Sequence, residues 1–462
     1  MNIVDHYRAE FSSRDGYFLG TTAARLHRRR RDALDRFANL GFPSSRQEAW
    51  KYTPIDTITQ RPYKPWDVWS QDSETPGKVW PRPNRDDLSD LYPPHPDSYC
   101  LVFVNGRHDQ SLSQSGNLPI GITVGNLVHY LDAPPKALEE HLDRHVATAS
   151  SNGFATLNSA FLSEGAFIHL APDTIIDAPI HLLFISTLDD DEAIIHPRVL
   201  IVAEENSTVE VVEHFTSLGG GHYFTNAVTE ISLGTNANLK HCKIQTEARQ
   251  ALHVATLQAY QAKDSHFASH SVSLGGRLTR NDINAVIGAE GSECTLDGLY
   301  MADGRQHVDY HTRIEHAKPH GTSHQRYKGV LMGKARGVFN GQIYVHPDAQ
   351  HTDAKQRNEN LLLSRDAEVN TEPQLNIFAD DVQCAHGATI GQLDKDMIFY
   401  LRARGIPADI AFNMLTYGFI NEILDLAPIA AIKPKLGEIV LAKLPDADKL
   451  KDQVLELVPH AA

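Results

Sequence analysis

The middle of the chain, from about residue 165 to residue 393, consists of short stretches rich in Val, Ile, Thr and Tyr, joined by Gly, Asn and Asp turns. This composition is typical of β-strands and tight turns. An apolar residue follows a polar turn at intervals of 27 to 31 residues, with one exception of 44. Such a repeat predicts the stacked coils of a β-solenoid, in which each coil buries an inward row against its neighbours. The residues expected to point inward are Val209, Leu239, Phe267, Val338 and Val369.

The long interval runs from Cys294, which belongs to the same repeat, to Val338. We expect it to contain an added loop or half-coil around Lys318 to Ser323. A β-sandwich would show a similar density of strands, so the spacing by itself leaves both folds open.

Both ends of the chain show helical rather than strand periodicity. Near the N-terminus, apolar residues recur at the helical period and predict a small α-helical unit; they are Leu26, Leu34, Phe37 and Leu40. The basic tetrad Arg28 to Arg31 lies within this unit, and nearby aspartates dilute its charge. We therefore expect a solvated helix face rather than a nucleic-acid signal.

The C-terminal part, after Asp394, predicts two helices, because Gly405 is suited to end the first and Pro407 to start the second. Apolar positions on this pair either meet a partner or cover the end of the solenoid. The stretch from Trp66 to Pro96 is dense in Pro, Trp and Asp and predicts an irregular surface excursion or linker. The expected regions are residues 1–160, 161–393 and 394–462.

Composition excludes several classes of protein. The chain has 462 residues, a formal net charge of −15 and 41% hydrophobic residues, which fits a soluble globular protein with no basic surface for nucleic acid. The sequence has no apolar run of about 18 residues and no secretory signal, so we expect a cytoplasmic protein without a membrane span. The four cysteines form no CxxC pair and indicate reduced thiols. They are Cys100, Cys242, Cys294 and Cys384.

No common catalytic motif is present. The segment from Gly329 to Ala335 resembles a phosphate-binding loop, but it has one residue too few between its glycines and lacks the Ser or Thr that would hold magnesium. The sequence also contains no GxSxG, HExxH or dinucleotide fingerprint. Catalysis by this chain itself therefore receives no local support.

Candidate chemistry concentrates in the triplet Cys384-Ala-His386, which follows an alternating apolar stretch and precedes a helix. We expect the triplet at a junction between the two. Residues two apart in an extended segment point to the same side, so the thiol and the imidazole can face one partner. One thiolate and one imidazole cannot enclose a cluster that takes about four protein ligands, so the remainder must come from elsewhere.

A second group of candidates is a run of histidines between residues 307 and 324. Imidazole is a common ligand of iron and zinc, although most such residues are surface or hydrogen-bonded groups. The group comprises His307, His311, His316, His320 and His324.

Several segments resemble the SufB/SufD family, and the closing signature from Pro373 to Ile406 resembles SufD in particular. The others are SSRQEAWKYT, LVFVNGR, FATLNSAFLSEGAFIHL and the stretch from His307 to Val345. SufD, which has no ATPase motif of its own, is the scaffold subunit of the SUF iron–sulfur cluster assembly complex. The resemblance covers nearly the whole chain except the span from Arg61 to Tyr99, and it implies a right-handed parallel β-helix core.

The resemblance also implies partners and a site. The partners are the paralogue SufB and the ATPase SufC, and the cluster assembly site lies at the SufB–SufD interface, with His386 and Cys384 as its residues and as metal ligands. The C-terminal helices would dock SufC through Phe399, Arg402, Met414 and Phe419. We expect nothing bound tightly to the isolated chain, and a nascent cluster or iron in the complex. Binding of reduced flavin to the complex, and a homodimer of the isolated chain, remain open.

Three alternatives stay in view. The first is a SufB-type paralogue, disfavoured because the cysteine-rich N-terminal motif of many SufB chains is missing. The second is a β-helix carbohydrate-active enzyme, which needs clustered acidic residues along one face; Asp380 and Asp381 are adjacent, and a strand would point them to opposite faces. The third is a metal-binding protein built on the histidine group.

Overall fold

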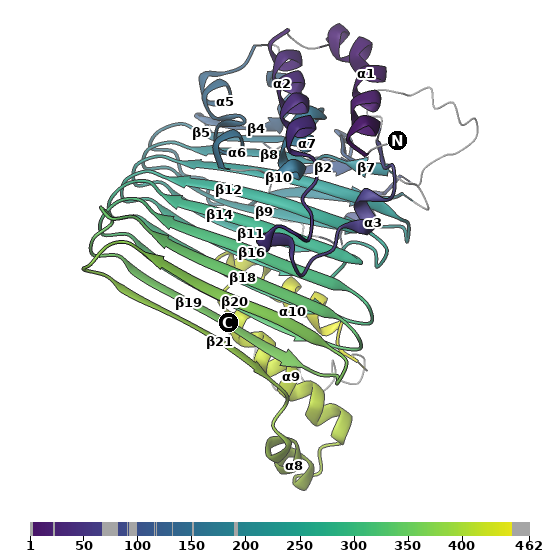
Figure 1. Cartoon of the computed structure of the whole chain (residues 1–462), viewed down its shortest axis with the longest axis vertical. Coiled ribbons are helices and arrows are strands. Elements are labelled where there is room, and N and C mark those ends of the chain that lie inside the picture. The colour runs from purple at the N-terminus through teal and green to yellow at the C-terminus, as the bar shows by residue number, and fades with distance from the viewer. Residues whose placement is uncertain are drawn as a thin grey trace.

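The computed structural model describes residues 3–21, 24–66, 82–89, 91, 99–114, 116, 118–131, 133–149, 152–188 and 193–445. Strands make up 41% and helices 24%, so the protein is mainly β, and its core is a solenoid of about 8 turns with helices at both ends (Figure 1). The strands of successive coils pair in parallel, which excludes the β-sandwich alternative.

The core is built from two stacked sheets. Sheet A contains β1 (Lys64–Pro65), β4 (Ile122–Asn126), β5 (Ala166–Leu170), β7 (Ala193–Ile195), β8 (Arg198–Ala203), β10 (Tyr223–Leu233), β12 (Leu252–Gln261), β14 (Leu278–Ile287), β16 (His307–His316), β18 (Arg336–Val345) and β20 (Glu368–Ile377). Sheet B contains β2 (Tyr99–Val104), β3 (Arg107–His108), β6 (Ile180–Ser186), β9 (Thr208–Ser217), β11 (Asn238–Gln245), β13 (His266–Ser273), β15 (Glu293–Ala302), β17 (Thr322–Leu331), β19 (Asp353–Leu362) and β21 (Gln383–Gly391). The chain alternates between the sheets, and β2 and β4 extend them with residues that precede position 161.

The inward apolar rows confirm most of the predicted repeat. Val209, Leu239 and Phe267 are buried in the main core between the sheets, and Val369 packs against it. One column of sheet B places residues 27 to 31 apart on successive strands: Val209, Leu239, Phe267, Cys294, Ser323, Ala354 and Cys384.

Two details of the predicted repeat are wrong. Val338 is buried but alternates with the core residue Phe339, so it lies on the outer face of sheet A, in register with Asp309. A shift of one residue along a strand moves a side chain to the opposite face. The interval from Cys294 to Val338 holds no added half-coil, because Thr322–Leu331 is an ordinary coil strand and Val338 belongs to the other sheet.

Helices and short segments cover sheet A at the N-terminal end of the solenoid (Figure 1). They are α1 (Ile3–Thr21), α2 (Ala24–Leu40), η1 (Glu48–Trp50), α3 (Asp56–Thr59), η2 (Leu127–Tyr130), α5 (Lys136–His141), α6 (Arg144–Ala149) and α7 (Gly153–Ala160). The expectation of a fully solvated basic face is wrong for Arg30, which is buried and donates from Nε to the Leu162 carbonyl at 2.6 Å. Leu40 is 43% exposed, whereas Leu26, Leu34 and Phe37 are buried as predicted.

A charged cluster holds the N-terminal segment on the outer face of sheet A. Arg280 donates to the Ala49 carbonyl at 2.7 Å, and its guanidinium lies 3.7 Å from the centre of the Trp50 ring. The same guanidinium pairs with Asp309 at 2.6 Å, and Thr53 donates to that carboxylate. The segment SSRQEAWKYT is therefore attached to a buried ion pair of the solenoid by hydrogen bonds and a cation–π contact.

The predicted irregular excursion lies largely outside the described residues. Within it the structure describes one short helix, α4 (Arg85–Ser89), so the expectation of no regular structure is wrong there. None of the helices in the described ranges is long and apolar enough to cross a membrane.

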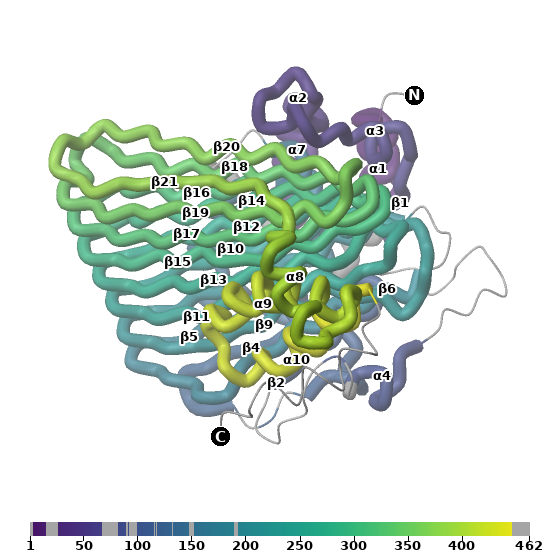
Figure 2. The backbone as a smooth tube through the Cα atoms, turned by 90° about the horizontal axis from the view of Figure 1, so that it is seen from below, coloured from purple at the N-terminus to yellow at the C-terminus, as the bar shows by residue number. Residues whose placement is uncertain are grey.

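The C-terminal helices are α8 (Lys395–Ala403), α9 (Ala408–Leu424), η3 (Ala430–Ile432) and α10 (Lys433–Leu441). Gly405 has a φ of +87° after α8, and Pro407 is the N-cap of α9, so the predicted break is confirmed. Ile420, Ile423 and Leu436 join a buried cluster with the outer face of sheet B. α9 and α10 lie against the solenoid in Figures 1 and 2, and α8 projects beyond it in Figure 1.

Candidate functional site

The C-terminal end of the solenoid is open. β20 and β21 are the last strands of sheets A and B, and no described strand pairs beyond them (Figure 2). Exposed apolar side chains accompany these edges, namely Ile377, Phe378 and Ile390. Edge strands carry backbone N–H and C=O groups that are free to pair with another chain, so this end is suited to association.

Cys384 and His386 both lie in strand β21, so the expectation that they sit at a junction is wrong. The two side chains point to the same, inner side, because Cys384 is in register with the core residue Ala354 and His386 with the buried Gln356. Cys384 is half-buried, and His386 is exposed. The strand therefore presents a thiol and an imidazole together at the open end.

Burial raises the pKa of the Cys384 thiol. The nearby Asp353 carboxylate raises this pKa as well, while a hydrogen bond with the Ala354 backbone acts in the opposite direction. Because the thiolate rather than the thiol binds metal or attacks sulfur, the isolated chain keeps Cys384 in its less reactive form at neutral pH.

The ligand set at this end is incomplete. Among the residues that the structure describes, no three His, Cys, Asp or Glu side chains are grouped so that they could hold a metal ion. Iron–sulfur clusters take about four protein ligands. Any cluster that uses Cys384 and His386 therefore needs further ligands beyond those that the described residues group there.

Comparison with known proteins identifies the family of this chain. Residues 184–419 match the family described as "SUF system FeS cluster assembly, SufBD core domain", and residues 1–182 match "SufBD protein N-terminal region". The chain belongs to the SufBD family.

Three bacterial proteins are among the relatives of this chain. A SufBD family iron–sulfur cluster assembly protein of Synechocystis is 32% identical over 91% of this chain and 92% of its own length. The iron–sulfur cluster assembly protein SufD of Escherichia coli is 31% identical over 89% of this chain and 92% of its own length. SufD of Bacillus subtilis is 26% identical over 66% of this chain and 68% of its own length.

The histidine group of this SufBD protein does not converge. His316 is buried and bonds to Ser323 Oγ at 2.9 Å, whereas His320 is in a turn and stacks on His351. His307 lies 2.9 Å from Thr53 Oγ1, and His311 lies 3.2 Å from Asp309 Oδ1, both on sheet A, while His324 is on sheet B. Their positions fit hydrogen-bonded structural groups rather than a metal centre.

The expected docking residues occupy two environments. Phe399 and Arg402 lie in α8, and the Phe399 side chain is 72% exposed. The structure describes the whole of α8, and none of its side chains is buried. Met414 and Phe419 lie in α9 and pack partly against sheet B, where Lys328 Nζ is 4.2 Å from the centre of the Phe419 ring. α8 therefore offers the freer surface, which also contains Met397 and Tyr400.

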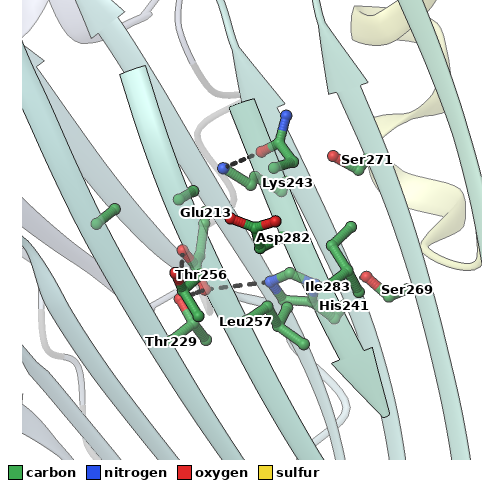
Figure 3. A pocket seen from close by; sticks show the side chains of 13 residues that line it. Glu213, Thr229, His241, Lys243, Thr256, Leu257, Ser269, Ser271, Asp282 and Ile283 are labelled. Atoms are coloured by element: carbon green, nitrogen blue, oxygen red, sulfur yellow. Dashed lines mark hydrogen bonds and ion pairs between the residues drawn. The ribbon is translucent and has the colours of Figure 1, made fainter. Parts of the chain in front are cut away.

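Sequence patterns did not reveal the polar cluster inside the solenoid (Figure 3). Glu213, His241 and Lys243 line a cavity of about 10 Å³, the space open to the centre of a water molecule, which has room for about one water. Burial lowers the pKa of Lys243 to about 8. Lys243 donates to Asn281 Oδ1 at 2.6 Å, and His241 lies 3.1 Å from Glu213 Oε1. The cluster satisfies its own members and leaves no room for a substrate.

The remaining candidates for catalysis do not form sites. Gly333 and Lys334 lie in a turn that leads into strand β18 rather than into a helix, so the segment is not a phosphate-binding loop. Asp380 and Asp381 lie in a bend after β20, and Asp381 pairs with His351 at 3.0 Å. They provide no spaced pair of carboxylates on one solenoid face.

Proposed function

We propose that this chain is a non-catalytic scaffold subunit of the SUF machinery that acts in the cytoplasm with SufB and the ATPase SufC. The observation that carries the proposal is the open end of the solenoid, where Cys384 and His386 lie together on the last strand of sheet B with too few ligands for a cluster among the described residues. Iron or a nascent iron–sulfur cluster would be cargo, held only when the partner supplies the missing ligands.

The partner at this end would be SufB. A second β-helix can pair its own edge strand with β20 or β21 through backbone hydrogen bonds, which is the usual way in which an exposed edge is used. Such pairing would bury Ile377, Phe378 and Ile390. In the absence of SufB, the same edges would support a homodimer of the isolated chain.

The partner at the C-terminal helices would be SufC, which would supply ATP hydrolysis. The exposed face of α8, with Phe399 and Arg402, is its proposed docking surface. ATP binding would shift the complex only if it favours one arrangement of the subunits over another. Because α9 follows α8 and packs on sheet B, a movement of α8 would be transmitted through α9 to the solenoid.

The test is co-expression of the chain with SufB and SufC in cells that lack the native subunit. The His386→Ala variant should fold and co-purify with both partners, because the ring is exposed and outside the core. Cluster formation, measured by absorbance of the purified complex and by growth under iron limitation, should fall sharply.

A matched control is His266→Ala, which removes a partly exposed histidine at the first position of β13. This control should behave as the wild type does. Full cluster formation in the His386→Ala complex would remove this residue from the mechanism, and failure to recover SufB with the wild-type chain would refute the scaffold assignment.

A further inference from the structure

Beneath His386 lies a row of buried amide side chains. Gln325, Gln356 and His386 are in register on β17, β19 and β21 and point to the inside of the solenoid. Gln325 and Gln356 are buried, whereas His386, at the open end, is exposed. Neighbouring strands lie about 4.8 Å apart, so each side chain in the row is within hydrogen-bonding reach of the next.

The row has a direction. Gln325 donates from Nε2 to Thr312 Oγ1, and Gln356 donates from Nε2 to Gln325 Oε1 at 2.6 Å. Each amide thus donates its N–H toward the interior, and the carbonyl of Gln325 accepts from the next amide toward the open end. At the last amide, Gln356 Oε1 is buried and has no hydrogen-bond partner among the described residues.

An acceptor without a partner is unusual, because buried polar groups are nearly always hydrogen-bonded. The position of Gln356 is also fixed from the opposite sheet. A Cβ on Gly341 would come within 1.9 Å of Gln356 Nε2, so the glycine makes the space that the amide occupies. The side chain that lies over Gln356 in register, toward the open end, is His386.

We propose that Gln356 is a positioning residue for His386. When the complex assembles, Gln356 Oε1 accepts a hydrogen bond from an N–H of the His386 ring, which fixes one tautomer. The other ring nitrogen then presents its lone pair to iron at the partner interface. Metal-binding histidines generally donate their second N–H to a carbonyl or carboxylate in this way, and loss of that contact typically costs about 10- to 100-fold in metal affinity.

The inference rests on the proposed role of His386, and its test separates the two. In the complex with SufB and SufC, Gln356→Met removes the acceptor while keeping an unbranched side chain, and cluster yield should fall about 10-fold. Gln356→Glu keeps an acceptor on a side chain of the same length, so it should retain most of the cluster yield that Gln356→Met loses. The control Gln374→Met changes an amide in β20 and should not alter the yield.

A second measurement does not depend on cluster formation. Ring-labelled histidine, assigned with His386→Ala, reports the tautomer of His386 by NMR in the assembled complex. One dominant tautomer should be seen in the wild type and a mixture in Gln356→Met. Identical ring signals in these two proteins would overturn the inference. Normal cluster formation in His386→Ala would instead overturn the function proposed for His386.

Discussion

Cys384 and His386 are neighbours on one strand but differ in their surroundings. The thiol is half-buried at the end of the inner column, and burial raises its pKa, whereas the imidazole is exposed. The other three thiols are buried, and burial raises the pKa of both Cys242 and Cys294 strongly. Cys384 is therefore the one cysteine whose thiol is partly accessible to solvent and so able to serve as a thiolate ligand of an iron–sulfur cluster.

Thiol alkylation tests this difference. In the native chain, one cysteine should react with a small maleimide, slowly at pH 7 and faster as pH rises toward the raised pKa of Cys384, because the thiolate is the nucleophile. Cys384→Ser should abolish this phase. The remaining three thiols should react only after addition of denaturant. Reaction of the folded Cys384→Ser variant with maleimide would contradict the expectation.

The ionic cluster beneath the N-terminal segment is the other residue-scale feature. Arg280 holds the pKa of the Asp309 carboxyl well below its usual range, against the effect of burial. A carboxyl whose pKa is depressed in the folded state stabilises the protein at pH values above its unfolded-state pKa. This stabilisation is lost as the pH falls toward the folded-state pKa.

Asp309→Asn should lower the free energy of unfolding by about 1.5 to 3 kcal/mol, because Arg280 loses one of its two carboxylate partners and keeps only Asp282. The measurement is urea denaturation at pH 7 and at pH 3, and the difference between variant and wild type should shrink at the lower pH. Asp303→Asn, which removes an exposed pair with Arg249, should cost less than about 1 kcal/mol.

Among the secondary-structure elements, the C-terminal helices have separate tasks. α9 and α10 cover the outer face of sheet B, where Val212, Cys242 and Ile244 would otherwise meet water, and α8 covers nothing. Deletion of everything after Asp394 would therefore strip the solenoid as well as remove a docking surface. Point changes in α8 are the sharper test.

Phe399→Asp should reduce recovery of SufC in a pull-down at least 10-fold, because a charge replaces an exposed apolar anchor. The thermal unfolding midpoint should change little, since the ring is 72% exposed. Lys395→Asp, at the start of the same helix, is the matched control. Wild-type recovery of SufC with Phe399→Asp would place the ATPase elsewhere.

The sequence predicted the elements better than their faces. The interval of 27 to 31 residues was enough for the coil, but Val338 was placed on the wrong face because a period of two tolerates no error of one residue. The sequence predicts a candidate site at Cys384 and His386 but places it at a junction. The last strand of a solenoid is not followed by another coil, so its sequence resembles that of a linker. The buried cluster of Glu213, His241 and Lys243 gave no signal, because its members meet only through folding of separate coils.

The whole molecule has one finished end and one open end. Helices and β2 to β4 close the N-terminal end, while β20 and β21 are left without partners among the described strands. Long exposed edges with apolar residues invite pairing with any available strand, so most proteins protect them. The lack of protection here fits a surface that is normally covered by a subunit.

Ile390→Lys should weaken association with SufB by at least 10-fold and shift the isolated chain toward the monomer, because an edge lysine opposes strand pairing. Light scattering after gel filtration measures both. Arg336→Glu, at an exposed position in β18, serves as the control and should leave the mass unchanged. An unaltered complex with Ile390→Lys would exclude this end as the SufB surface.

A solenoid coil is held only by the coils on either side of it, and the last coil has one neighbour instead of two. Its amide protons should therefore exchange with deuterium through small local openings. The amide protons of β10 to β14 should exchange more slowly, because their exchange requires larger unfolding events. Cys384 and His386 thus lie where the fold frays most readily. Capture by a partner would slow this exchange, so the site and its structural order would be completed in the same event.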